Sequence, residues 1–413
     1  MRFLSLLISI ALLDIGNGLQ QTVIGLRARI EGYSDETVGV MMSAYFVGFV
    51  LGSLFAPRVI QQVGHIRAFA AFASAISAIA LCFVLVISPS AWIVLRIVQG
   101  ACYAGAVIVV ESWLNAATER SARGRVLAVY MVVIYSAWAL SQPLVAIASP
   151  KGFVLFALVS ICLSLSLVPI TLSRTGDPGV VSAKRLGLVR LIAISPTALV
   201  GSFVLGAVVA AFFGMGPVVG QSAGLSDAEI GVLLSAPLVG ALVFQWPLGW
   251  LSDMMDRRYI ILGGSLAAAL FSMLLAGSLG VSPMPFVLVL CFLLGGAIMP
   301  LYSVCLAEAN DRIDESELIA AAGGFVLIYG VGSAAGPVTA SLVMGQVGAS
   351  GLFFAMTAVL MAFALFGALR IRRRKKTAAA DKQSYVATPS TSHAALPLHR
   401  HGTGEAEGKK APQ

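Results

Sequence analysis

The sequence is divided into long apolar stretches, and this feature limits the possible folds more than any other. A helix that crosses the hydrocarbon core of a bilayer, about 30 Å thick, needs about 20 apolar residues. Twelve stretches of about that length occur, with polar residues between them. Hydrophobic residues make up 58% of the chain and charged residues only 11%, which excludes an assembly of soluble domains. We therefore expect an all-α membrane protein.

The predicted membrane spans form two groups of six. The first group covers 3–25, 36–57, 66–87, 91–115, 125–148 and 152–172, and the second covers 191–217, 228–250, 259–279, 283–307, 318–345 and 350–369. This pattern predicts two six-helix bundles, 1–172 and 191–370, joined by a cytoplasmic linker at 173–190. Residues 371–413 are rich in polar and small residues that cannot bury a core, so we expect a disordered cytoplasmic tail.

Lysine and arginine residues are unevenly distributed between the two sides of the predicted bundles. If the N-terminus is cytoplasmic, 23 of the 27 basic residues lie in cytoplasmic segments. Only Arg27, Arg29 and Lys151 lie in external loops, and Arg96 lies within a span. Because basic residues in short loops stay on the cytoplasmic side, both termini are predicted to be cytoplasmic. Topology and contact with anionic lipid explain the net charge of +8, and we expect no nucleic-acid partner.

The two halves of the chain repeat one another. Segment 32–48 aligns without a gap on segment 224–240, and nine of the seventeen positions are identical. Tyr135 and Tyr329 each precede a proline by eight residues, in the fifth and eleventh predicted spans. An even number of spans separates the repeats, so both have the same orientation. Such parallel halves can rock about a site near the midplane of the membrane.

Several short segments resemble signatures of the major facilitator superfamily. Gly-Trp-Leu-Ser-Asp-Met-Met-Asp-Arg-Arg, at 249–258, resembles the loop signature in which a glycine is followed four residues later by an aspartate and then by basic residues. In the first half, Gln61 stands at the position of that aspartate. Leu-Arg-Ile-Val-Gln-Gly, at 95–100, is similar to the Arg signature of the fourth helix. The likeness extends to uncharacterised bacterial transporters of the YcaD type through segments 109–113, 123–130 and 332–337.

The resemblance covers roughly residues 1–370 and implies a transporter fold of two pseudo-symmetric bundles in the bacterial cytoplasmic membrane. It also implies a role for the loop signature at the cytoplasmic surface. Asp253, Arg257 and Arg258, which follow Gly249, would act there as a latch that depends on conformational state. The resemblance supplies no solute.

One face of the first predicted helix is polar. Asp14, Asn17 and Gln21 share this face, and Asp14 lies near the centre of the bilayer. An ionised carboxylate there costs roughly 2.5–3.5 kcal/mol, so Asp14 should face an aqueous cavity or be protonated. The equivalent region of the second half offers Phe212 and Phe213, which predicts an aromatic wall opposite an acidic one. In the alternative interpretation, Asp14 and Asn17 only form hydrogen bonds with neighbouring helices.

Arg96 is the second ionisable residue within the apolar zone. We expect its side chain to hold Asp14 ionised in one state and to release it in the other, so that the carboxylate carries a proton. In the alternative interpretation, Arg96 extends toward the external headgroups. Gln99 belongs to the same signature and is included in the predicted pathway.

Glu111 and Glu308 lie near the cytoplasmic ends of two spans that are partners in the repeat. Their recurrence suggests a matched task. We expect both to close the inner mouth of the cavity by pairing with basic residues of nearby loops, for instance Arg120, Arg123 and Arg312. Direct contact with the solute is the alternative.

The sequence lacks the features of an ATP-driven pump or an intramembrane enzyme. It has no phosphate-binding Gly-Lys-Ser/Thr loop, and all four histidines lie outside the predicted spans. The five cysteines show no CxxC spacing, so we expect no metal site and no cofactor. We expect a monomeric secondary transporter of a small organic solute, coupled to protons or another ion. The alternatives are an uncoupled facilitator and a transporter-like sensor that moves nothing.

Overall fold

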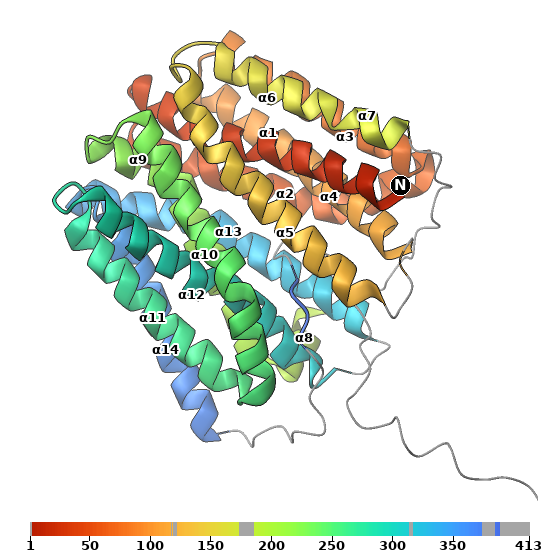
Figure 1. The fold of residues 1–413 in the computed structure, drawn as a ribbon, viewed down its shortest axis with the longest axis vertical. Coiled ribbons are helices and arrows are strands. Elements are labelled where there is room, and N and C mark those ends of the chain that lie inside the picture. The colour runs from red at the N-terminus through yellow and green to blue at the C-terminus, as the bar shows by residue number, and fades with distance from the viewer. Residues whose placement is uncertain are drawn as a thin grey trace, which may run out of the picture.

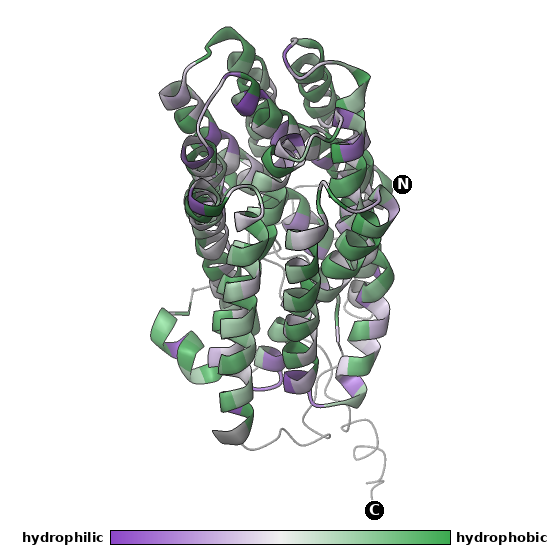
Figure 2. Ribbon diagram, turned by 90° about the vertical axis from the view of Figure 1, so that its left-hand side faces the viewer, coloured by the Kyte–Doolittle hydropathy of each residue, from purple (hydrophilic) through white to green (hydrophobic). Residues whose placement is uncertain are grey.

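The computed structural model describes residues 2–116, 118, 122–172, 186–313, 317–373 and 385–388. Within these residues, twelve helices are long and apolar enough to cross a membrane, which confirms the predicted fold (Figure 1). Figure 2 shows that residues of the hydrophobic class make up most of these helices. The chain is therefore a multi-pass membrane protein.

The helices form two halves of the chain. The N-terminal half contains α1 (Arg2–Ile30), α2 (Asp35–Val63), α3 (His65–Leu85), α4 (Pro89–Ala116), α5 (Arg123–Ser141), the 3₁₀ helix η2 (Gln142–Ile147), α6 (Val154–Leu165) and α7 (Leu167–Thr171). The C-terminal half contains α8 (Leu188–Ile194), α9 (Pro196–Ser222), α10 (Asp227–Met254), α11 (Arg257–Ser278), α12 (Met284–Asn310), α13 (Leu318–Val347) and α14 (Gly351–Arg373).

Two predicted spans are divided or shifted by proline. The span predicted over 125–148 changes from α5 to η2 after Ser141, because Pro143 has no N–H group to continue the α-helical pattern. The span predicted to begin at 191 instead begins at Pro196, after the separate helix α8. The Ser195 hydroxyl caps α9 by accepting a hydrogen bond from the Ala198 N–H at 3.0 Å.

Part of the predicted disordered tail, 371–413, belongs to the folded structure. Residues 371–373 belong to α14, and residues 385–388 pack against α10 and α12. The remainder of the tail, 374–384 and 389–413, lies outside the described residues, as does 173–185 of the predicted linker.

The repeat is visible in the turns that lead into α2 and α10. Gly32 and Gly224 have positive φ angles of 79° and 77°, a backbone conformation that favours glycine. Two residues later, the hydroxyls of Ser34 and Ser226 each cap the following helix at a distance of 3.3 Å. Equivalent residues therefore build equivalent helix starts in the two halves.

The repeat also governs how helices pack within each half. An added Cβ atom at Gly48 in α2 would collide with the carbonyl oxygen of Ile97 in α4, and one at Gly240 in α10 would collide with that of Phe292 in α12. Gly48 and Gly240 are equivalent in the repeat. Glycine at these positions lets two helix backbones approach closely, which stabilises helix packing in membranes.

The interface between the halves pairs α2 with α13 and α5 with α10. We call the end with the α2–α3, α4–α5 and α10–α11 connections the basic end, and the end with the α1–α2 and α9–α10 turns the opposite end. Gly231 of α10 lies against the backbone of Gln142, and the Ser235 hydroxyl donates to the Ala139 carbonyl at 2.9 Å. These contacts close the two halves against each other at the opposite end.

Candidate functional site

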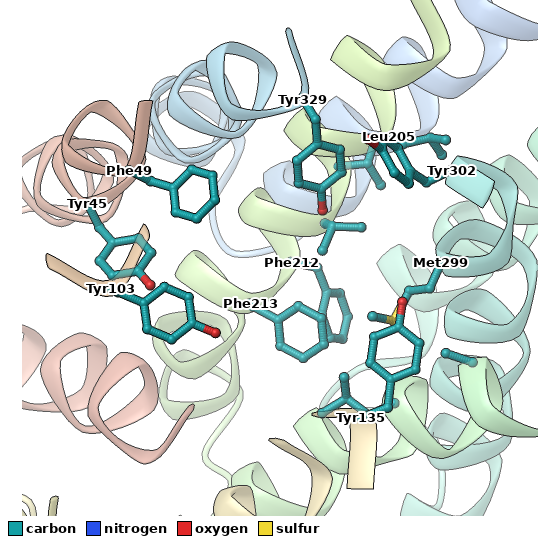
Figure 3. Close-up of a cluster of buried hydrophobic side chains, with 14 of the residues drawn as sticks. Tyr45, Phe49, Tyr103, Tyr135, Leu205, Phe212, Phe213, Met299, Tyr302 and Tyr329 are labelled. Atoms are coloured by element: carbon teal, nitrogen blue, oxygen red, sulfur yellow. The ribbon is translucent and has the colours of Figure 1, made fainter. Parts of the chain in front are cut away.

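A central cavity of about 90 Å³ lies between the two halves. Its wall combines residues of α1, α2, α4 and α5 with residues of α9, α12 and α13. Much of this wall is aromatic, and Figure 3 shows tyrosine and phenylalanine rings from both halves facing one another. The volume is sufficient for several water molecules.

Asp14 lies on the wall of the central cavity and is 4% exposed. The Tyr103 hydroxyl donates a hydrogen bond to Asp14 Oδ1 at 2.5 Å. The second carboxylate oxygen, Oδ2, has no hydrogen-bond partner among the described residues. One oxygen of Asp14 is therefore held in place while the other is available to a proton or a bound molecule.

Two further polar residues of α1 lie beside Asp14 on the cavity wall. The Tyr45 hydroxyl donates to Asn17 Oδ1 at 3.3 Å, and Gln21 accepts from Arg96 through its side-chain oxygen at 2.5 Å. The structure thus brings together three residues that the helical spacing of the sequence placed on one face.

Arg96 is fully buried behind this wall rather than at a membrane surface. Its Nη1 donates to Gln99 Oε1 at 3.2 Å, and its guanidinium carbon lies 4.6 Å from the centre of the Tyr45 ring. No ion pair joins Arg96 to Asp14 within the described part of the chain. In this conformation Arg96 therefore orients Gln21 and Tyr45. The alternative interpretation, in which Arg96 extends toward the headgroups, does not fit this buried position.

The two phenylalanines predicted to form an aromatic wall have different positions. Phe213 lines the central cavity and packs against Trp138, with ring centres 4.4 Å apart. Phe212 is not part of the lining, because its ring is buried edge-on against Phe213 at 5.3 Å (Figure 3). Gln99 is also behind the wall, where its amide donates to Gln20 at 2.7 Å.

Several cavity residues were missed at the level of sequence. Tyr103 follows Arg96 by seven residues and therefore lies on the same face of α4. Tyr135 and Tyr329, which the repeat had already singled out, both line the central cavity from α5 and α13. These spacings were visible signals, but tyrosine in a membrane helix is also a common packing residue.

Glu111 and Glu308 are both buried near the basic end. Glu308 pairs with Arg312 at 2.7 Å, as expected, and also accepts a hydrogen bond from the Ser195 hydroxyl. Glu111 accepts a weak hydrogen bond from the Tyr130 hydroxyl at 3.4 Å. Arg120 and the Arg123 side chain, proposed as partners of Glu111, lie outside the described residues.

The residues of the predicted latch form ion pairs within the C-terminal half. Asp253 pairs with Arg257 at 3.2 Å, and Arg257 also pairs with Asp311 at 3.0 Å. Arg258 pairs instead with Asp256 at 2.7 Å. The structure therefore joins the ends of α10, α11 and α12 through Arg257, while Arg258 belongs to a separate pair.

The model of the Major Facilitator Superfamily matches residues 6–226 and 198–400, which together cover most of the chain. The chain belongs to the Major Facilitator Superfamily. An uncharacterized MFS-type transporter of Yersinia enterocolitica, YE1530, is 26% identical over 91% of this chain and 97% of its own length. The uncharacterized MFS-type transporter YcaD of Escherichia coli is 27% identical over 87% of this chain and 93% of its own length.

Two solved transporter structures have the same fold. The nucleoside transporter NupG matches with a TM-score of 0.76 and 13% identity, over 90% of this chain and 99% of its own. A bacterial homolog of the human lysosomal transporter Spinster, in an inward-facing and unoccupied conformation, matches with a TM-score of 0.72 and 14% identity. The match covers 90% of this chain and 98% of the homolog. Family and fold together support a role in membrane transport.

Proposed function

We propose that the protein is a secondary active transporter that moves a small organic solute across the bacterial cytoplasmic membrane by alternating access, with proton coupling through Asp14. The observation that carries the proposal is the position of Asp14, a buried carboxylate with one unpartnered oxygen on the wall of a cavity between two repeated halves. A charge in this place is costly, so an ionisable residue here favours a functional role.

The basic end is proposed to face the cytoplasm. The excess of lysine and arginine in its loops supports this orientation. The contacts of Gly231 and Ser235 with the N-terminal half then close the external end of the central cavity. Rocking of the halves about the cavity would release these contacts and bring the basic ends together.

The lining favours a compact organic cation with an aromatic or apolar body. Asp14 is the only acidic or basic residue among the described residues that line the cavity. The surrounding rings include Tyr45, Trp138 and Phe213, and aromatic faces attract cations through their π electrons. An ammonium group of the solute would bind Asp14 Oδ2, while its body would contact the rings.

Proton coupling follows from the use of one carboxylate for two purposes. A proton on Asp14 removes the charge that would bind a cationic solute, so the proton and the cation compete for the same oxygen. One proton would therefore move in exchange for one cation. This exchange is electroneutral, because both carry a single positive charge.

Proteoliposomes with an imposed pH gradient test the proposed function. A labelled arylalkylamine, which carries a protonated ammonium group at neutral pH, should accumulate against its gradient when the proton gradient supplies the driving force. An uncoupled facilitator would equilibrate the amine without accumulation, and a non-transporting sensor would leave its distribution equal to that in empty liposomes. Either of these two results would contradict coupled transport.

The preference for a cation predicts a difference between matched ligands. An arylalkylamine, protonated at neutral pH, should raise the midpoint of thermal unfolding of the purified protein, because binding to the folded state stabilises it. The carboxylic acid of the same size and shape should not, because Asp14 repels it. Equal shifts from both compounds, or a shift from the acid alone, would show that the class of solute is wrong.

Asp253→Asn is expected to lower the turnover of the transporter more than its affinity for the solute. The carboxylate pairs with Arg257 at the end of α10 and lies outside the lining of the central cavity. Asparagine loses the charge that pairs with Arg257 but keeps an oxygen that can accept a backbone hydrogen bond. Initial rates measured over a range of solute concentrations separate the two parameters. Asp227→Asn, in the first turn of α10 at the opposite end, is the matched control. A changed KM with an unchanged maximal rate would contradict a role in conformational change.

A further inference from the structure

Four residues of the C-terminal tail, Tyr385 to Thr388, lie in a groove at the basic end of the C-terminal half. In Figure 1 this short blue segment runs beside α13, among the helices of the C-terminal half. Tyr385, Val386 and Ala387 pack against the apolar core, and Thr388 is 7% exposed. The segment is therefore part of the folded structure, although the tail 371–413 as a whole is rich in polar and small residues.

Hydrogen bonds fix both ends of this docked segment. The Tyr385 N–H donates to both carboxylate oxygens of Asp253, at 2.9 and 3.2 Å, and the Gln245 amide donates to the Tyr385 hydroxyl at 2.6 Å. At the other end, the Thr388 N–H donates to Ser303 Oγ at 3.1 Å and the Thr388 carbonyl accepts from the same hydroxyl at 2.9 Å. Main-chain groups make most of these bonds, as in the binding of an extended peptide.

The Tyr385 ring occupies a space that only glycine leaves open. A Cβ atom at Gly249 would collide with this ring. Gly249 is the glycine of the loop signature, and Asp253 is its aspartate. The docked segment thus covers the two positions of α10 to which the resemblance assigned a role in conformational change.

The same face of α10 contacts the N-terminal half at the opposite end. Gly231, Ser235, Gln245, Gly249 and Asp253 lie within about 40° of one line along the helix, at 100° per residue. Toward the opposite end this face contacts α5 and η2, and toward the basic end it contacts the docked segment. The segment therefore lies where the halves would meet if the basic end closed.

The phenol of Tyr385 is buried within the docked segment. Burial raises the pKa of the Tyr385 phenol above its usual range, so the ring is neutral at physiological pH. A neutral, hydrogen-bonded ring can remain between two apolar helices without an uncompensated charge.

We propose that the groove formed by Gln245, Gly249, Asp253 and Ser303 is a binding site for the chain's own segment 385–388, and that the docked segment is an autoinhibitory strap. While it is docked, α5 cannot reach the second half of α10, so the two halves cannot close at the basic end. Release of the strap must precede that closure. This inference rests on the groove and the repeat, and does not require that the solute or the coupling ion be known.

Photo-crosslinking tests the docking directly. p-Benzoylphenylalanine in place of Tyr385 should form a crosslink to a peptide of α10 or α12 in the full-length protein in lipid nanodiscs. The same amino acid at Val86, an exposed residue between α3 and α4 at the opposite end, is the control and should give no crosslink to these helices. Equal crosslinking from both positions, or none from either, would overturn the proposed site.

Distance measurements test whether the strap holds the basic end apart. Spin labels at Ala128 in α5 and Met254 in α10, both exposed, report the separation of the halves once the native cysteines are replaced. Replacement of 385–388 by Gly-Ser-Gly-Ser should shift the distance distribution toward shorter values, and Tyr385→Ala should shift it in the same direction. The same replacement at 391–394 should leave the distribution unchanged. If the two four-residue replacements give the same distance distribution, segment 385–388 does not restrain closure of the basic end.

Discussion

Asp14→Asn should abolish the accumulation of solute that a pH gradient drives. Asparagine preserves the size of the side chain and can still accept the Tyr103 hydrogen bond, but it cannot take up and release a proton. For exchange of one proton for one cation, a gradient of one pH unit is worth about 1.4 kcal/mol, or up to about tenfold accumulation. In the variant this accumulation should fall to the level found without a gradient.

Two controls separate coupling from folding. Asp35→Asn removes a carboxylate from an exposed pair with Arg29, far from the central cavity, and should retain accumulation. A membrane potential imposed with valinomycin should not change uptake by the original chain, since the exchange is electroneutral. Tenfold accumulation by Asp14→Asn would show that another group carries the proton.

Gly48→Ala and Gly240→Ala are expected to destabilise the fold strongly, although neither residue lines the cavity. Each added methyl group would meet a carbonyl oxygen of the neighbouring helix, so the two backbones must move apart. Overpacking of this kind costs about 1–3 kcal/mol, and more where backbone must shift. Titration with a denaturing detergent should show a lower free energy of unfolding for both variants.

Gly263→Ala is the matched control for these two substitutions. An added Cβ atom at Gly263 in α11 meets no atom within 4 Å. Because alanine also reduces the conformational freedom of the unfolded chain, this variant should be unchanged or more stable by about 0.4–1 kcal/mol. If Gly263→Ala loses as much stability as Gly48→Ala, close contact between helices does not explain the loss.

The sequence contains enough information to predict the fold and part of the site. The length of the apolar stretches predicts the spans, and the helical period places Asp14, Asn17 and Gln21 on one face. Both kinds of regularity are local, so they can be read without knowledge of tertiary contacts. The aligned repeat further predicts the equivalent turns at Gly32 and Gly224.

The remaining features depend on contacts between distant segments. No local pattern indicates that Tyr103 would hold one oxygen of Asp14, or that Phe212 would turn away from the cavity while Phe213 lines it. Arg96 was expected to face Asp14, yet its guanidinium group donates hydrogen bonds to Gln21 and Gln99 instead. The composition of 371–413 as a whole favours disorder, and no local pattern indicates that 385–388 docks, because the groove that binds this segment is built from α10 and α12.

The distance between the halves at the opposite end is the most direct test of alternating access. Glu36 in α2 and Gln346 in α13 are both exposed, and the Glu36 carboxylate lies beside Gly345 of the other half. Spin labels at these two positions, measured in nanodiscs at acidic and alkaline pH, should show a short distance and a second, longer one. The longer population should increase under the conditions in which the Ala128–Met254 distance at the basic end decreases. A single distance at each end, unchanged by pH and by Asp14→Asn, would contradict a cavity that opens alternately to the two sides.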